Sequence, residues 1–333
     1  MTDFMPLAVG VTPLETRRDV IVHVATRAEE LGYSSFSAAE GWGHDVTVLL
    51  AEVALKTSRI RIGTGVLNVW GRSAGTIAMA ATSLAELSNG RFSLGLGAGS
   101  PSLAEGLHDK AFRDPIAQLG AITRQVRGLL AGERMTPSEP FETRPLKLAV
   151  RPAAPVPINI AGLGPRSIRL TGELADAWYP FLMPRSGLTD GVLLLKEGAG
   201  RVPGGRSLPT ISPGIPVGIS PDPAVARTVA AWWVSFYLTS MGPLYAGELR
   251  KRGFGAAVDD VLAANPGRGT AEVPASAQVL IDELTLCGDA ETARAGLDSW
   301  YAAGADEPTL VLPPNRPVEE LDYILEGMRP TAR

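Results

Sequence analysis

The sequence predicts an α/β fold, namely a closed (β/α)8 TIM barrel with insertions. Short apolar runs alternate with segments of helical periodicity, a pattern that is typical of βαβ units and a parallel sheet. Seven or eight strand candidates follow one another in this way, which favours a closed barrel over an open sheet. Barrels of this length, 333 residues, form one unit, so we expect a single domain over residues 1–333.

The expected elements follow from the apolar pattern and from the placement of glycine and proline. Strands are expected at residues 7–11, 33–38, 60–67, 92–96, 158–161, 177–181, 211–219 and 309–312. Helices are expected at residues 15–31, 44–56, 76–87, 116–131, 165–174, 223–238, 274–284 and 290–303. Two stretches do not fit the alternation. Residues 132–157 are rich in proline, and residues 240–273 are rich in glycine and are interpreted as an insertion or lid.

Composition indicates a globular chain and excludes several classes of partner. Apolar residues make up 45% of the chain, charged residues 20%, and the net charge is −4. This charge gives no electrostatic basis for binding nucleic acid or an anionic membrane, and neither is an expected partner. No apolar run is long enough for a membrane span, and the N-terminus lacks the features of a signal peptide. With Cys287 as the sole cysteine, no disulfide can form within one chain, and we expect a cytoplasmic location.

Two glycine-rich stretches follow or interrupt expected strands. Residues 95–100 resemble a dinucleotide fingerprint but fail as one, because Ser100 replaces the third glycine and Pro101 stands where the helix should begin. The stretch is interpreted as a strand end that passes close to a flat ligand, or else as a barrel corner. Residues 63–68 carry glycine at alternate positions, which indicates a bulge or ligand approach, or small residues that fill the barrel interior.

A third glycine-rich stretch, residues 161–167, lies between an expected strand and an expected helix. Amides of a first helical turn bind anions, and Arg166 and Ser167 could add contacts. We interpret this stretch as a phosphate cradle. The alternative is a plain tight turn before a helix that starts with proline.

Acid/base candidates crowd residues 40–45, directly after the second expected strand. Carboxyl ends of barrel strands build active sites, so Glu40 and His44 are candidate catalytic groups. Asp45 is a candidate substrate contact, although an acidic residue that offsets the helix dipole explains it equally well. His108 is a second substrate candidate, with a solvated loop histidine as the alternative. With three histidines and no metal-binding motif, a metal enzyme is not expected, and no motif for phosphoryl transfer or serine hydrolysis is present.

Several segments together resemble the luciferase-like superfamily, and within it the coenzyme F420-dependent oxidoreductases. The matching segments are AEGWGHD (39–45), SRIRIGTGVLNVWGRS (58–73), LAELSNGRFSLGLGAG (84–99), INIAGLGP (158–165), GELADAW (172–178) and GDAETARAGLDSWYAAGAD (288–306). The last of these is similar to the final helix and strand of the family. The resemblance covers most of the chain apart from about residues 185–285, and it implies a TIM barrel with a flavin or deazaflavin at the carboxyl ends of the strands.

The resemblance also implies which residues hold the cofactor, either F420 or, alternatively, FMN. A non-prolyl cis peptide that backs the ring would correspond to Gly65–Val66. The other implied cofactor contacts are Ala39, Asn68 near the ring or tail, Arg72 at an anionic tail, Gly97, Ala98, Gly99 and Ser100 along the cofactor, and Ala161, Gly162, Gly164, Pro165 and Arg166 at its phosphate. Trp42, Asp45, Trp70 and His108 would contact substrate. The family's Gly-Trp-His-Gly segment reads Gly-Leu-His-Asp here (106–109), which makes glucose 6-phosphate oxidation doubtful.

The predicted function is F420-dependent hydride transfer between reduced deazaflavin and a small molecule or specialised metabolite. Reduction of a carbonyl, imine or activated double bond is slightly favoured, with Glu40 or His44 supplying the proton. One alternative is an FMN-dependent monooxygenase that uses reduced flavin and oxygen, with residues 240–273 as a lid that excludes water. Another is a barrel that binds cofactor without turnover. A homodimer is expected, since dimers are usual in the resembling family.

Overall fold

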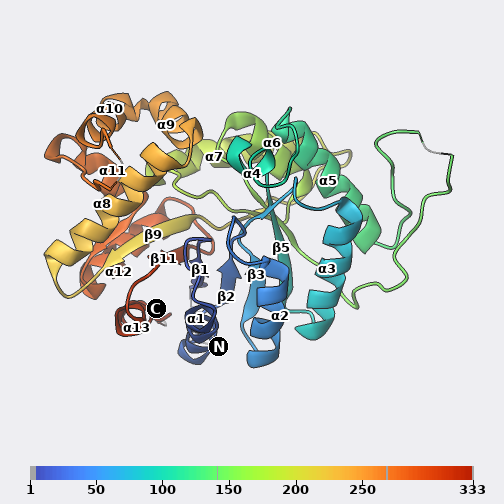
Figure 1. Cartoon of the computed structure of the whole chain (residues 1–333), viewed down its shortest axis with the longest axis horizontal. Helices are drawn as coiled ribbons and strands as arrows, with labels where there is room; N and C mark the ends of the chain where they lie inside the picture. Colours follow the sequence, from blue (N-terminus) through green and yellow to red (C-terminus); the bar gives the residue numbers. More distant parts are fainter. Residues whose placement is uncertain (1–4, 141, 268, 332–333) are drawn as a thin grey trace.

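A parallel β-barrel forms the centre of the computed structural model, which describes residues 5–140, 142–267 and 269–331 (Figure 1). The strands are β1 (Ala8–Val11), β2 (Ser35–Ala38), β3 (Arg61–Thr64), β4 (Leu67–Asn68), β5 (Phe92–Gly97), β6 (Ile158–Ala161), β7 (Ala177–Trp178), β8 (Thr210–Ile211), β9 (Gly214–Ile219), β10 (Leu286–Gly288) and β11 (Thr309–Leu312). They form one sheet in the order β10-β9-β11-β1-β2-β3-β5-β6-β7-β8, with β4 beside β5, and neighbours pair in parallel.

The sheet closes on itself. β3 and β4 are pieces of one interrupted strand, as are β8 and β9, and β10 is an extra strand beside β9, so eight of the eleven described strands remain as barrel positions. Phe181, just after β7, bridges to Gly214 of β9, and β9 pairs with β11, which pairs with β1. The predicted (β/α)8 TIM barrel is confirmed.

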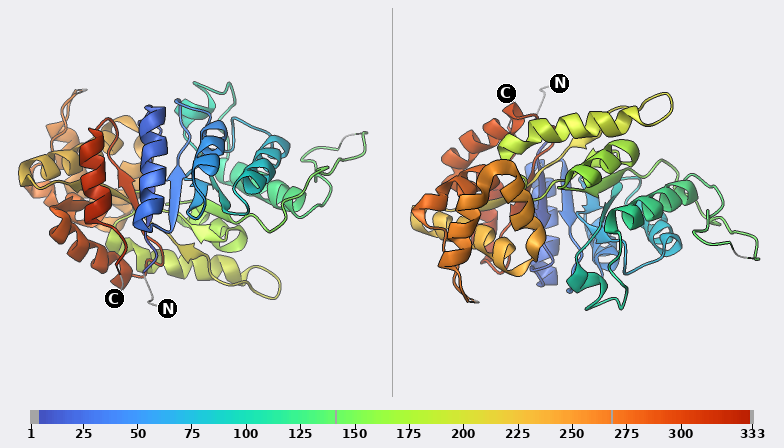
Figure 2. Two further views of the ribbon diagram at one scale, coloured as in Figure 1. Left: turned by 90° about the horizontal axis from the view of Figure 1, so that it is seen from below. Right: turned by 90° about the horizontal axis from the view of Figure 1, so that it is seen from above.

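Helices cover the outside of the barrel and one of its ends (Figure 2). They are α1 (Arg18–Leu31), α2 (Val46–Lys56), α3 (Ala74–Leu87), α4 (Pro101–Ala104), α5 (Pro115–Leu130), α6 (Pro165–Leu174), α7 (Leu188–Gly200), α8 (Pro223–Ser240), α9 (Pro243–Leu249), α10 (Gly255–Ala264), α11 (Gln278–Leu284), α12 (Ala290–Ala302) and α13 (Val318–Gly327). Helix starts follow the sequence signals. Asp45, Asp222 and Asp289 each accept a hydrogen bond from an amide of the first turn, and α5, α6 and α8 begin with proline.

The glycine-rich stretch at residues 240–273 is more ordered than the sequence suggested. It contains α9, a kinked turn at Arg250–Phe254 with Gly253 at φ 92°, and α10. Together with α8 and α11 these elements enclose a second apolar cluster beside the central core, built around Trp233, Val258 and Leu280. The segment is therefore a helical insertion, because Ala257, Val258 and Val261 give α10 a buried apolar face despite the glycines.

Several other elements depart from the sequence expectations. The strand expected at 60–67 is broken between Thr64 and Leu67, and the one expected at 211–219 is broken at Ser212–Pro213. The segment 288–306 holds α12, but β11 and α13 follow it, so it is not the end of the fold. Helix α7, helix α13 and strand β10 had no clear sequence signal. Between α5 and β6 the described residues form neither helix nor strand, and the chain projects away from the body (Figures 1 and 2).

Small residues surround Tyr179 in the barrel interior. A Cβ at Gly10 would lie 2.7 Å from Ser37 Oγ, and one at Gly214 would lie 2.9 Å from the Tyr179 hydroxyl. Tyr179 follows β7, and its hydroxyl makes hydrogen bonds with Ser37 and Thr309 across the barrel. The Tyr179 ring occupies the space beside Gly214, because a packed interior has no room for both this ring and a side chain at position 214. No helix in the described part of the chain is long and apolar enough to cross a membrane.

Glu29 ties α1 to the start of β3. Its carboxylate accepts hydrogen bonds from the amides of Ser58, Arg59 and Ile60, and these bonds, opposed by partial burial, lower its pKa to about 2. Its stabilising effect is therefore complete above the unfolded-state pKa and is lost as the pH falls from about 4.5 to about 2. Glu29→Gln is expected to lower the free energy of unfolding by about 1–2 kcal/mol at pH 7, because solvent screens this partly exposed carboxylate. The loss should be smaller near pH 2.5.

Urea unfolding of the wild type and of Glu29→Gln at pH 7 and pH 2.5 measures this effect. Glu30→Gln is the matched control, because Glu30 lies on the same helix and pairs with Arg27 only at the surface. A Glu29→Gln penalty that is the same at both pH values would contradict the assignment.

Candidate active site

The carboxyl ends of β2, β3, β5 and β6 meet at one edge of the barrel. Register places Ala38 beside Thr64, Asn68 beside Gly97, and Gly97 beside Ala161. In a parallel barrel the loops after these ends build the site. The structure therefore brings together the predicted segments that begin at Ala39, Gly65, Ala98 and Gly162.

Glu40 is a buried acid at this edge, 8% exposed. Its amide donates to Val66 O at 2.8 Å, which ties the end of β2 to the interrupted third strand. Its carboxylate accepts hydrogen bonds from Asn68 Nδ2 at 3.1 Å and from Arg72 Nη1 at 2.7 Å. Arg72 Nη2 also lies 2.8 Å from Asp45 Oδ2, so Arg72 joins both carboxylates.

Opposing effects set the charge of these groups. Burial raises the pKa of Glu40 above its ordinary value, although the Arg72 ion pair opposes the shift. Burial also acts on Asp45, but hydrogen bonds from Thr47 and Arg72 outweigh it and lower the pKa of Asp45. Two carboxyl groups whose pKa values are pushed apart are suited to different roles in acid–base chemistry.

Asn68 connects Glu40 to His108. It is fully buried, and its Nδ2 lies 3.3 Å from His108 Nε2 in addition to its contact with Glu40. Its Oδ1 accepts from the amides of Trp70 at 3.0 Å and Gly71 at 2.9 Å. The imidazole of His108 lies against Gly71, where a Cβ would come within 2.7 Å of Cε1. His108 therefore belongs to the site, although it is distant from Asn68 in sequence.

Trp70 fixes the loop after β5. Its Nε1 donates to Ala98 O at 2.7 Å, and its ring lies 5.4 Å from that of Phe112. Gly99 adopts φ +65°, and its Cα faces the Trp70 indole. A positive φ is the reason for glycine at this position.

The other glycines of this region serve strand packing. A Cβ at Gly97 would lie 2.6 Å from Val66 Cγ1, and one at Gly95 would overlap the carbonyl oxygen of Thr64. The barrel-corner interpretation therefore explains Gly95 and Gly97 better than close approach of a ligand. The prediction of a cis peptide at Gly65–Val66 is wrong. Within the described residues every peptide bond is trans, Gly65–Val66 included, and the bulge forms by a break in strand pairing.

Helix α4 corrects another expectation. It begins at Pro101 with Ser100 as its N-cap, whose hydroxyl accepts from Leu103 N at 3.4 Å. Proline is compatible with a first helical position, so its presence was no argument against a helix. The helix is only four residues long, which still separates this turn from a dinucleotide-binding unit.

The predicted phosphate cradle is an open helix start. Gly164 is the N-cap of α6 and offers no side chain to its amides, and Pro165 is the first helical residue. Trp178 Nε1 donates to Gly162 O at 2.8 Å, and a Cβ at Gly162 would press on Ser167. The N-cap residue therefore leaves the amides of the first turn without a side-chain cap.

Neighbours of the cradle come from two sides. Arg166 lies at the surface, 3.3 Å from Asp114 Oδ1. From the helical insertion, Arg252 Nη2 donates to Leu163 O at 2.9 Å, and the Glu248 carboxylate lies 3.4 Å from where a Gly164 Cβ would be. The insertion therefore touches the turn that begins α6.

Four predicted residues stand apart from the Glu40 carboxyl or have a partner other than the one expected. His44 is exposed and its Nε2 contacts Thr16 O at 2.9 Å, with no contact to Glu40 among its hydrogen bonds. Trp42 is 53% exposed. Asp45 caps α2 through Thr47 N, as the structural alternative anticipated, and Arg72, expected at an anionic tail, is occupied by Glu40 and Asp45.

An aromatic cluster near the barrel was missed by the sequence interpretation. Phe181 contacts Tyr237 at 4.9 Å and Tyr245 at 6.4 Å between ring centroids, and Tyr237 contacts Tyr245 at 5.2 Å. Burial raises the pKa of Tyr179, Tyr237 and Tyr245. The run Trp-Trp-Val-Ser-Phe-Tyr at 232–237 was the available signal, but it was assigned only to a hydrophobic helix.

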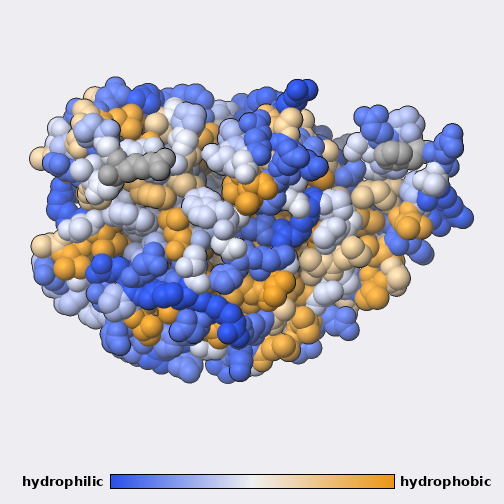
Figure 3. Space-filling model, in the orientation of Figure 1, coloured by the Kyte–Doolittle hydropathy of each residue, from blue (hydrophilic) through white to orange (hydrophobic). Residues whose placement is uncertain are grey.

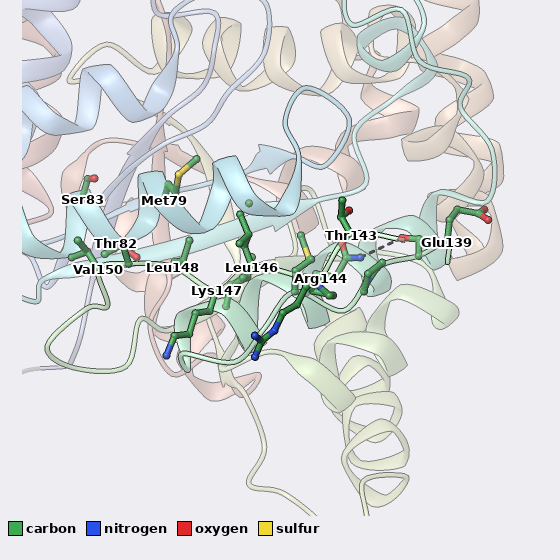
Figure 4. Close-up of a pocket in the computed structure, with 18 of the residues that line it drawn as sticks. Met79, Thr82, Ser83, Glu139, Thr143, Arg144, Leu146, Lys147, Leu148 and Val150 are labelled. Carbon is green, nitrogen blue, oxygen red and sulfur yellow. Dashed lines mark hydrogen bonds between the residues drawn. The ribbon is translucent and has the colours of Figure 1, made fainter. Parts of the chain in front are cut away.

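A prominent groove of the described residues lies elsewhere. A groove of about 860 Å³ lies between α3, α5 and the projecting segment, where Met79, Leu146 and Val150 face it (Figure 4). Apolar groups gather beside α3 on this face (Figure 3). Met79 of α3 is 55% exposed. No buried acid or base lines it, so we place the chemistry at the barrel mouth.

A barrel that gathers a buried acid, a histidine and an open helix start at one mouth is an enzyme scaffold for small molecules. The family model described as luciferase-like monooxygenase matches residues 4–307. The chain therefore belongs to the luciferase-like monooxygenase family.

Individual relatives share much of the chain. A Mycobacterium tuberculosis protein provisionally named a coenzyme F420-dependent oxidoreductase is 31% identical over 89% of this chain and 90% of its own. An F420-dependent secondary alcohol dehydrogenase solved with an F420-acetone adduct superposes with a TM-score of 0.76 at 19% identity, covering 97% of this chain and 98% of its own. The FMN-bound oxygenating constituent of 3,6-diketocamphane monooxygenase from Pseudomonas putida gives 0.71 at 15% identity, covering 98% and 97%. The two structures show a shared fold.

Proposed function

We propose that this protein is an F420-dependent oxidoreductase that transfers a hydride between the deazaflavin and a small-molecule substrate. The observation that carries the proposal is the alignment of β2, β3/β4, β5 and β6, which brings a buried acid and an open helix start to one mouth. The relative with 31% identity along nearly the whole chain is named for F420, which favours this cofactor over FMN.

The residues at this mouth fit a planar, phosphate-bearing cofactor. In our proposal Ala161, Gly162, Gly164, Pro165 and Arg166 hold the phosphate, because the first-turn amides of α6 have no side-chain cap. The backbone around Gly65–Val66, with Ala39, Asn68 and the Ala98–Ser100 turn, supports the ring system. When bound, the deazaflavin supplies hydride donation or acceptance.

The chain's own groups then orient the substrate and manage a proton. Glu40, with its raised pKa and its place between Asn68 and Arg72, exchanges a proton with the substrate oxygen or nitrogen. Trp42, Trp70 and His108 line the substrate side. Arg72 and Asp45 hold the Glu40 carboxyl in place, and His44 serves as a peripheral contact.

The helical insertion is proposed as a lid. Its contacts from Arg252 to Leu163 and from Glu248 to the Gly164 position place it on the cradle. The aromatic side chains of Tyr237 and Tyr245 would give an organic substrate an apolar wall. A cytoplasmic homodimer stays a prediction, and the exposed apolar residues Val48 on α2 and Met79 on α3 mark a surface that it could bury.

Charge variants at Arg166 test the cradle. Arg166 is 75% exposed, so Arg166→Gln and Arg166→Glu should fold normally, and an acid in the first turn even suits the helix dipole. We expect F420 to bind roughly threefold more weakly to Arg166→Gln and about tenfold or more weakly to Arg166→Glu. Quenching of deazaflavin fluorescence in an equilibrium titration measures the affinity.

Arg59→Glu is the matched control, because Arg59 is exposed at the amino end of the strands, away from the cradle. Equal affinity of wild type and Arg166→Glu would remove the phosphate from this turn. If Arg59→Glu weakened F420 binding as much as Arg166→Glu, the loss of affinity would be a result of net charge and not of a contact at the cradle.

A further inference from the structure

We propose that Asn68 is a positioning residue that fixes His108 as a neutral imidazole protonated on Nδ1 and orients the carboxyl group of Glu40. The effect of Asn68 on catalysis rests on the proposed role of Glu40 as the proton-exchanging group. The tautomer itself follows from hydrogen-bond directions in the free protein.

The orientation of the Asn68 amide is fixed by the backbone. Its oxygen accepts from two N–H groups, Trp70 N at 3.0 Å and Gly71 N at 2.9 Å. An inverted amide would point an NH2 group at two donors and would leave buried polar groups unsatisfied. Asn68 therefore directs Nδ2 toward the other side, where Glu40 Oε2 lies at 3.1 Å and His108 Nε2 at 3.3 Å.

Facing a donor, His108 Nε2 must act as an acceptor. A neutral imidazole has one protonated and one unprotonated nitrogen, so the proton of His108 lies on Nδ1. Packing supports this fixed placement, since the ring edge lies against the Gly71 backbone, where no side chain could fit. His108 thus presents an N–H donor from Nδ1 and cannot be a solvated loop histidine.

The other two histidines have opposite surroundings. His44 Nε2 lies 2.9 Å from Thr16 O, and His23 Nε2 lies 2.8 Å from Asp322 Oδ1. Both partners only accept, so these two Nε2 atoms must carry protons. One protein therefore contains two internal references for the unusual tautomer at His108.

Nitrogen NMR of 15N-histidine-labelled protein, without added cofactor at pH 7, tests the tautomer. Peaks are assigned with His23→Gln, His44→Gln and His108→Gln. We expect a protonated Nε2 in His23 and His44 and an unprotonated Nε2 in His108. A protonated Nε2 in wild-type His108 would overturn the proposal, and this spectrum needs no variant at Asn68.

Asn68→Asp tests the positioning role. The aspartate keeps an acceptor for Trp70 N and Gly71 N but replaces the donor by a negative oxygen that faces Glu40 and His108. His108 Nε2 should become protonated. The Glu40 carboxyl, whose other charged neighbours are Arg72 and, through it, Asp45, should titrate about one pH unit higher, as followed by its side-chain carbon resonance assigned with Glu40→Gln.

The outcomes separate the two claims. An unchanged Glu40 titration in folded Asn68→Asp would overturn the positioning role even if the tautomer is as expected. If Asn68→Asp does not fold, Asn68→Ser, which loses the Nδ2 donor without adding charge, should free His108 to take the Nε2-protonated form. The turnover of Glu40→Gln is measured in a separate assay. The proposed catalytic function can therefore be disproved while the tautomer of His108 is confirmed.

Discussion

Glu40→Gln is expected to lower turnover by about 10²–10⁴-fold while leaving F420 affinity within about threefold. Glutamine keeps the shape of the side chain and an oxygen that can accept from Arg72 or Asn68, so the loop is retained. It cannot exchange a proton. Turnover is measured by the absorbance of oxidised F420, with reduced F420 and a panel of carbonyl, imine and activated alkene substrates.

Glu30→Gln on the outer face of α1 is the control for Glu40→Gln, since it removes a carboxylate from an exposed ion pair with Arg27. It should leave the rate on the same substrate unchanged. A Glu40→Gln enzyme with wild-type turnover and wild-type pH dependence would show that the proton comes from another group.

Gly198→Ala should cost about 3 kcal/mol or more of folding free energy, the largest stability effect that we expect from one methyl group. Helices α6 and α7 approach backbone to backbone. A Cβ at Gly198 would overlap the carbonyl oxygen of Arg169, and the reciprocal Gly172 faces the carbonyl of Leu195. Because both obstacles are main-chain atoms, no rotamer change can relieve them.

Gly200→Ala is a matched control at the end of the same helix, because nothing lies within 4 Å of its Cβ position. It should be neutral or stabilising by up to about 1 kcal/mol, as alanine favours helix. Thermal unfolding and urea midpoints of the two variants measure the difference. Similar midpoints for Gly198→Ala and Gly200→Ala would contradict the close packing of α6 on α7.

The local sequence pattern was sufficient to predict the helices that have a clear apolar period and a clear N-terminal capping residue or proline. Helix α2 begins at the Asp45 cap and α6 at Pro165, and both were expected within two residues of their observed starts. Helix α7 was missed because its glycines lower helix propensity, yet Gly198 is there for the contact with α6. Tertiary packing, which propensity does not contain, selects glycine at that position.

The candidate site likewise contains residues that local sequence predicts and contacts that only the tertiary structure shows. Glu40 could be predicted because it directly follows a strand end, and the open start of α6 because glycine and proline mark it. The Asn68–His108 contact joins a residue of β4 to one in the connection after β5, and no local period indicates it. Gly97 was assigned to a ligand, whereas the structure shows that Val66 fills the space beside it.

Competition between the two cofactors at one mouth tests the central claim most directly. The purified protein is titrated with F420 and with FMN, each followed by its own fluorescence, and the bound form is then challenged with the other. The proposed barrel should bind F420 and resist displacement by an equal concentration of FMN. Tight FMN binding with no measurable F420 binding would contradict the assignment and favour a flavin-dependent monooxygenase.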